Sequence, residues 1–128
     1  MTVMMLMVGN CSPKKLCVSI VDPARPTWFV RHYGFFLHIE NESGHRNPHI
    51  FDDDSSFFLV PDQFYPGYYA LQSINIPTHY ILVTGDGRTK IVERQRGQNY
   101  QDTASFVLTD HAVGRKELVE SSVYRRAK

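Results

Sequence analysis

The chain has almost no net charge and no long apolar run, and both absences exclude whole classes of protein. Its 14 basic and 13 acidic residues give +1 at pH 7, so no overall field draws it toward nucleic acid or an anionic membrane. No run approaches the roughly 18 consecutive apolar residues that cross a bilayer. The apolar start, MTVMMLMVG, is short and lacks a basic region, so it makes a poor signal peptide.

Tryptophan occurs once, whereas phenylalanine and tyrosine occur 8 and 7 times beside 7 prolines. This composition is typical of strands and turns rather than of helices. A length of 128 residues suffices for one hydrophobic core. We therefore expect a single all-β domain.

Cysteine is scarce as well, with only Cys11 and Cys17. They could form one small disulfide, but their spacing does not require it. The favoured interpretation is two ordinary thiols, with Cys17 on a buried strand.

The sequence contains an internal repeat. PTWFVRHYGFF, from Pro26, is matched 51 positions later by PTHYILVTGDG, from Pro77. FDDDSSFFLVP, around Phe57, is matched 49 positions later by YQDTASFVLTD, around Phe106. A spacing kept within two residues at both ends of a segment indicates duplication rather than chance.

Each copy has the pattern of four short strands with a hairpin between the second and the third. In the first copy we expect a turn at Tyr33-Gly34, a polar loop over 40–47, and strands at 16–20, 28–31, 35–39 and 57–60. In the second copy we expect a turn over 85–87, a loop before the last strand, and strands at 70–74, 80–83, 89–93 and 106–108. Residues 1–15 show no clear period and are interpreted as an N-terminal extension.

A third copy begins near the end of the chain. Ser73 follows Ser19 by 54 residues, and Ser121 follows Ser73 by 48. The tail over 110–128 is therefore predicted to open a truncated third lobe with a strand, and a helix with a partial apolar stripe is the alternative. Three units of this kind predict a β-trefoil with lobes at 16–66, 67–113 and 114–128, since three propeller blades are too few to close.

The two complete copies differ in their polar residues. Where the first copy has His32 and Asp54, the second has Val83 and Thr103. Losing both polar members together is expected if one unit carries a site and the other does not. A carboxylate accepts two hydrogen bonds from vicinal hydroxyls, and an imidazole can donate one and accept another.

Three segments carry a family resemblance: FVRHYGF at 29–35, DSSFFLVP at 54–61 and SINIPTHYI at 73–81. They resemble the arabinofuranose-binding β-trefoil modules of α-L-arabinofuranosidase B-type enzymes, carbohydrate-binding module family 42-like. The resemblance covers roughly residues 16–121. It implies a non-catalytic domain in which His32 and Asp54 hold sugar hydroxyls.

The predicted ligand-binding set adds three residues to that pair. Arg31 precedes the histidine, and Tyr33 or Phe35, with Tyr65 as an alternative, would cover the apolar face of a sugar ring. The expected partner is an arabinofuranosyl-containing glycan, with no nucleic acid, membrane, metal or cofactor. The alternatives are that His32 and Asp54 only bond each other or the backbone, and that the domain is a protein-interaction or structural module.

Other patterns are weaker. His45, His49 and the acidic run over 52–54 could chelate a cation, but a solvated acidic loop is the favoured interpretation. Short loops seldom form the deep cleft that glycoside hydrolysis needs, so catalysis is not expected. The resemblance favours an extracellular location. Missing third-lobe strands predict exposed sheet edges and association into homo-oligomers.

Overall fold

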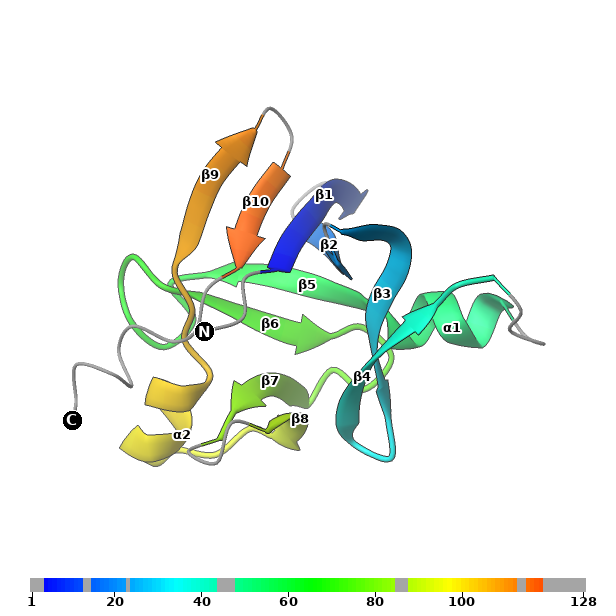
Figure 1. Ribbon diagram of the computed structural model, residues 1–128. Helices are drawn as coiled ribbons and strands as arrows, with labels where there is room; N and C mark the ends of the chain where they lie inside the picture. Colours follow the sequence, from blue (N-terminus) through cyan, green and yellow to red (C-terminus); the bar gives the residue numbers. More distant parts are fainter. Residues whose placement is uncertain are drawn as a thin grey trace.

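The computed structural model describes residues 4–12, 15–22, 24–43, 48–84, 88–112 and 115–118 (Figure 1). Within these ranges the chain forms β1 (Met4–Ser12), β2 (Lys15–Asp22), β3 (Arg25–Tyr33), β4 (Phe36–Asn41), α1 (Pro48–Asp54), β5 (Ser56–Pro61), β6 (Tyr69–Ser73), β7 (His79–Val83), β8 (Thr89–Glu93), α2 (Gln98–Thr103), β9 (Leu108–Ala112) and β10 (Arg115–Leu118). No helix among these residues is long and apolar enough to cross a membrane.

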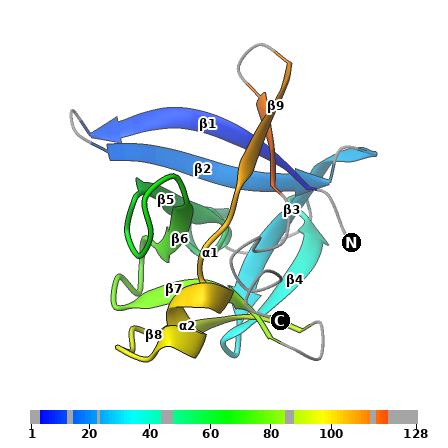
Figure 2. The same cartoon turned by 90° about the vertical axis from the view of Figure 1, so that its left-hand side faces the viewer.

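The strands close into a barrel. Neighbours follow the order β3-β4-β8-β7-β6-β5-β2, and β2 pairs again with β3, which closes a ring of seven strands. The remaining strands continue from β2 in the order β1-β10-β9. Figure 2 shows β1 and β2 side by side across one end of the molecule, with α2 at the other end. The predicted all-β class is therefore confirmed, and closure leaves the seven ring strands without a free edge.

The core follows from alternation along the strands. Val18 and Ile20 on β2, like Phe57 and Leu59 on β5, are two residues apart and buried, because successive side chains of a strand point to opposite faces. The largest buried cluster is made of Leu6, Val18, Ile20, Val30, Phe57, Leu59, Leu71, Ile81, Ile91 and Phe106. Phe57 and Phe106, which align in the repeat, are 0% and 1% exposed.

Two short helices, α1 and α2, lie in segments that the sequence predicted to be loops. The first ends at Asp54 and the second at Thr103, and each buries one aromatic ring, that of Phe51 or Tyr100. Their backbones match at a separation of 49 residues: Ser55 N donates to Phe51 O at 2.9 Å, and Ala104 N donates to Tyr100 O at 3.0 Å. Helices of six or seven residues are too short to establish a helical period and consist largely of weak helix formers.

The N-terminal segment belongs to the sheet. Met4–Ser12 is strand β1, which pairs with both β2 and β10, although the sequence shows no clear period there. Cys17 is disulfide-bonded, which overturns the interpretation of two free thiols. The side chain of Cys11 lies outside the described side chains.

The tail forms strands where it is described. β9 and β10 are a paired hairpin, so the helical alternative is wrong for Leu108–Ala112 and Arg115–Leu118. Residues from 119 onward lie outside the described residues. Among the described strands, β9 stands last in the order and pairs with β10 alone, and association through such an edge stays a prediction.

The predicted hairpin between β3 and β4 is confirmed, but its two-residue turn is Gly34-Phe35, one residue later than the predicted Tyr33-Gly34. Gly34 and Phe35 have φ of 59° and 67°. Two positive φ values characterise the type I′ turn, whose twist matches the flanking strands. A bulky side chain rarely adopts this conformation. Phe35 does so while its ring stacks on His79, with centroids 5.4 Å apart.

We expect Phe35→Gly to be more stable than Phe35→Ala by about 1 kcal/mol, because both variants lose the ring but only alanine keeps the steric strain of positive φ. Urea unfolding of both variants measures the difference. An alanine variant as stable as the glycine variant would contradict the strained turn.

Candidate functional site

The candidate site joins segments that are distant in sequence. Arg31 and His32 are consecutive on β3. Asp54 is the last residue of α1, and Asn75 follows β6. Arg31, His32 and Asp54 are only 8%, 6% and 8% exposed, whereas Asn75 is exposed.

The Asp54 carboxylate is the centre of the network. Its Oδ2 accepts a hydrogen bond from Arg31 Nη2 at 2.5 Å, and its Oδ1 accepts one from Asn75 Nδ2 at 2.9 Å. His32 Nε2 lies 3.5 Å from Oδ1. The structure thus brings the predicted residues Arg31, His32 and Asp54 together, and both carboxylate oxygens already have protein partners. Their role as sugar ligands stays a prediction.

Asn75 determines the tautomer of the histidine. Its Oδ1 accepts from Ser73 Oγ at 3.0 Å and lies 2.8 Å from His32 Nε2. Because an amide oxygen only accepts, Nε2 is the donor and carries a proton. Sequence reasoning missed Asn75 as a site residue, although it lies in the S-I-N part of the motif that carries the resemblance.

The Arg31 guanidinium is held on several sides. Its Cζ lies 5.5 Å from the ring centroid of Tyr33 and 5.6 Å from that of Phe51, which are cation–π distances. Its Nη1 lies 3.9 Å from Oε2 of Glu40. Among the described residues, its Nε is buried and has no hydrogen-bond partner. A buried donor left unpaired costs about 1–3 kcal/mol.

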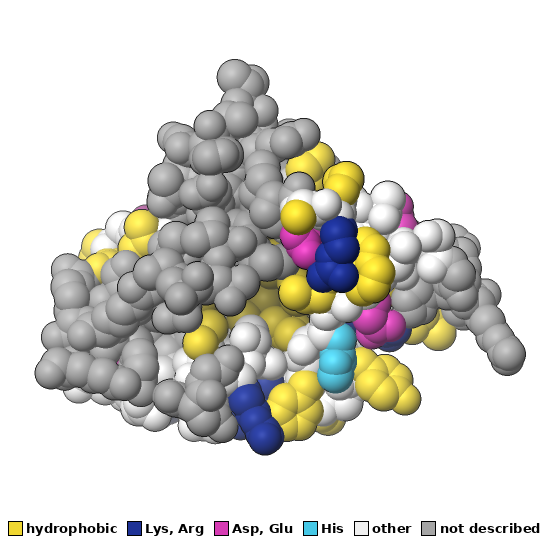
Figure 3. Space-filling view, viewed as in Figure 1, with side chains coloured by type: hydrophobic (Ala, Val, Ile, Leu, Met, Phe, Trp, Pro, Cys, Tyr) yellow, Lys and Arg dark blue, Asp and Glu magenta, His cyan; other side chains and the backbone are white. Residues whose placement is uncertain are grey.

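Two exposed aromatic rings lie on the strand that carries Arg31 and His32 and on the turn that follows it. Tyr33 is 67% exposed and Phe35 53%. Figure 3 shows hydrophobic side chains beside a histidine, with basic and acidic side chains nearby, on the face viewed in Figure 1. Rings of this kind can cover the apolar face of a sugar.

The alternative aromatic, Tyr65, lies elsewhere. Its hydroxyl donates to Oδ1 of Asp102 on α2 at 2.5 Å, and this hydrogen bond, with a smaller effect of burial, raises the pKa of Tyr65. In the second half, the residues that align with the predicted pair form no such network. Thr103 Oγ1 donates to the helix backbone, at 2.9 Å to Asn99 O and 3.1 Å to Tyr100 O.

Comparison with known protein families gives a match. The alpha-L-arabinofuranosidase B (ABFB) domain matches residues 8–108. The chain belongs to this family. ABFB domains are accessory carbohydrate-binding domains of arabinofuranosidases rather than catalytic ones. The predicted resemblance is thereby confirmed at the level of the family. No curated protein sequence matches the chain.

Solved structures match the fold at 13% sequence identity. A mutant GH54 α-L-arabinofuranosidase soaked with 4-nitrophenyl α-L-arabinofuranoside matches with a TM-score of 0.58. An arabinofuranosidase complexed with arabinofuranosyl-α-1,2-xylobiose matches with a TM-score of 0.60. Each match covers 83% of this chain and 19% of the other chain. At this identity the likeness shows the fold alone, and the ABFB domain described here spans about a fifth of those enzymes.

We expect Arg31→Met to lower the free energy of unfolding by about 3–5 kcal/mol, because it leaves the buried Asp54 carboxylate without its cationic partner. The double variant Arg31→Met/Asp54→Leu should lose less than the sum of the two single variants. Urea unfolding of the four proteins closes the cycle.

Arg25→Met is the matched control, since Arg25 pairs with Asp22 at 2.9 Å with its side chain 48% exposed. Exposed ion pairs contribute little to stability, so this variant should unfold much like the wild type. Equal losses for Arg25→Met and Arg31→Met would refute the structural importance of the buried pair.

Proposed function

We propose that this ABFB domain is a non-catalytic carbohydrate-binding domain that recognises arabinofuranose-type side chains or a related glycan through one shallow site. Membership of the ABFB family across residues 8–108 is the observation that carries the proposal. The site would lie at the β3–β4 hairpin, above the network of Arg31, His32 and Asp54.

The geometry supports two kinds of role in this site, positioning by buried residues and sugar contact by exposed ones. The buried carboxylate already accepts from Arg31 and Asn75, so it orients these groups rather than facing solvent. Asn75, Tyr33 and Phe35 are exposed and offer a polar edge and aromatic faces to a sugar. A shallow site with so few contacts gives millimolar affinity, about −4 kcal/mol.

The β-trefoil is the fold proposed for the domain. Three pairs of consecutive strands, β1–β2, β5–β6 and β9–β10, form antiparallel hairpins, and β3–β4 and β7–β8 form two more. A repeated unit of strands and a short helix supports this fold. A third counterpart of β3–β4 is not among the described residues.

The disulfide bond of Cys17 supports a secreted protein, since disulfides persist in oxidising compartments. The share of the matching arabinofuranosidases that the chain spans supports a role beside a catalytic domain. In such an enzyme, this domain would bind the same glycan that the catalytic domain acts on.

Titration of the ¹⁵N-labelled domain with L-arabinose and with arabinoxylan oligosaccharides tests the proposal by NMR. We expect saturable shifts around residues 31–36 and 73–79, which Tyr33→Ala and His32→Ala remove or weaken at least about tenfold. Met7→Ala is the control, because Met7 is an exposed apolar residue, 46% exposed, on β1 outside the site.

Dispersed spectra of each variant establish that the fold is intact. If no saturable shift appears up to tens of millimolar ligand, the sugar-binding proposal fails. The alternative of a protein-interaction or structural module then takes its place.

A further inference from the structure

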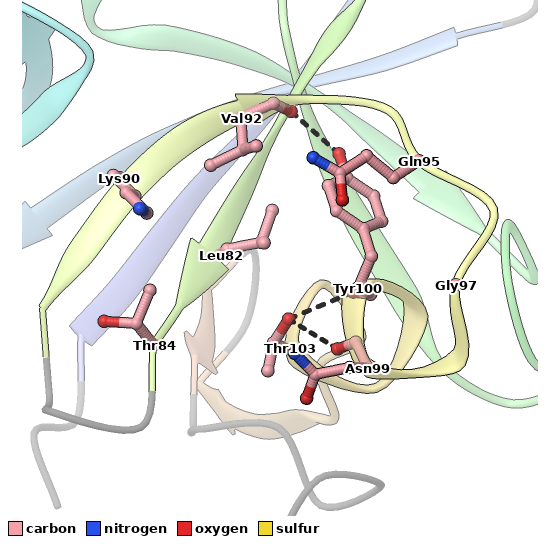
Figure 4. Close-up of a pocket in the computed structure, with 9 residues that line it drawn as sticks. All are labelled: Leu82, Thr84, Lys90, Val92, Gln95, Gly97, Asn99, Tyr100 and Thr103. Atoms are coloured by element: carbon pink, nitrogen blue, oxygen red, sulfur yellow. Dashed lines mark hydrogen bonds between the residues drawn. The ribbon is translucent and has the colours of Figure 1, made fainter.

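The second half of the barrel contains a pocket that the proposed site does not use. It has a volume of about 350 Å³ and lies between the β7–β8 hairpin and α2 (Figure 4). Its lining consists of Leu82, Thr84, Lys90, Val92, Gln95, Gly97, Asn99, Tyr100 and Thr103. The volume falls at the lower end for small-molecule sites and suits a single sugar ring.

The pocket exists because the two halves differ in the residues between hairpin and helix. Leu82 on β7 aligns with Arg31 on β3, and Thr103 on α2 aligns with Asp54 on α1. In the first half the guanidinium and the carboxylate meet in a buried ion pair. In the second half both replacements are shorter and uncharged, and Thr103 bonds back to its own helix. Space that the ion pair fills in one half stays open in the other.

The floor of this pocket is apolar and neutral. In Figure 4, Leu82 lies between Val92 and Tyr100 on one side and Thr103 on the other. The Tyr100 hydroxyl donates to Val92 O at 2.8 Å, and burial raises the pKa of Tyr100, so the ring stays uncharged. Such a floor suits the C–H face of a sugar rather than a bare inorganic anion.

The described part of the rim is polar and includes one charged side chain, that of Lys90. Lys90 is half-buried, and it forms no ion pair with a described residue, in contrast to Arg25 and Arg31. Gln95 and Asn99 offer exposed amides, which can donate and accept hydrogen bonds. Among the described residues that line the pocket, none is acidic. The lining is therefore complementary to an anionic group that carries hydroxyls.

We propose that this pocket binds a monosaccharide unit that bears a carboxylate, a uronic acid. The carboxylate lies against the Lys90 ammonium, the hydroxyls bond Gln95 and Asn99, and one ring face packs on Leu82 and Tyr100. This site is independent of the proposed arabinofuranose site, with which it shares no residue.

The experiment is an NMR titration of the full chain with sodium glucuronate, with glucose and with sodium acetate in parallel. We expect saturable glucuronate shifts at residues 82–84, 90–92 and 95–103, with glucose and acetate each binding at least about tenfold more weakly. Glucose tests the need for the carboxylate, and acetate tests the need for the ring. Higher salt should weaken glucuronate binding, because screening weakens charge attraction.

Lys90→Gln should weaken glucuronate binding about tenfold, whereas Arg96→Gln, which removes an exposed charge outside the lining, should leave it unchanged. His32→Ala should also leave it unchanged, which separates this proposal from the arabinofuranose site. The proposal is overturned if Lys90→Gln and Arg96→Gln weaken binding equally, if acetate binds as well as glucuronate, or if glucuronate gives no saturable shift.

Discussion

The buried Asp54 carboxylate is the constraint on which this part of the structure depends. It lies at the end of a short helix and binds a cation from β3 and an amide that follows β6, so one side chain joins three segments. A carboxylate that is only 8% exposed is tolerated only when its oxygens have partners. This need for hydrogen-bond partners holds α1 against the barrel and fixes the side chains of Arg31 and Asn75.

The two halves show what the same backbone does with and without that constraint. Each half places a six- or seven-residue helix shortly before its central phenylalanine, which is Phe57 on β5 in the first half and Phe106, in an isolated bridge with Tyr69, in the second. Ser56 and Ser105 each donate to the helix carbonyl four residues back at 2.6 Å. In the first half the Arg31–Asp54 ion pair fills the space beside α1. In the second half the corresponding space beside α2 is a pocket. Different residues at a few buried positions therefore give the two halves different surfaces around similar helices.

Much of the fold could be predicted from local patterns. Alternating apolar residues specify the strands, and the glycine of the β3–β4 turn specifies the hairpin, because both signals act within a few residues. The helices were missed because six or seven residues give no periodic signal. β1 was missed because its partners, β2 and β10, include a strand more than a hundred residues away in the sequence.

For the site, the difference between the two copies indicated His32 and Asp54 correctly as neighbours. It could not indicate Asn75, because the copies were compared position by position while the contact runs from one copy to the next. Nor could it show the burial of Arg31, since burial depends on the helix that the sequence pattern did not reveal. Long-range packing, rather than local propensity, determines both features.

Asn75 belongs to the second copy of the repeat that the sequence predicts, yet its amide completes a network centred in the first. The corresponding position in the first copy, two residues after Ser19, is Val21. The polar network is therefore shared across the boundary between copies, and a single copy folded alone would lack one of its members. The network therefore lies at a junction, where a substitution on one side constrains which residues the other side can keep.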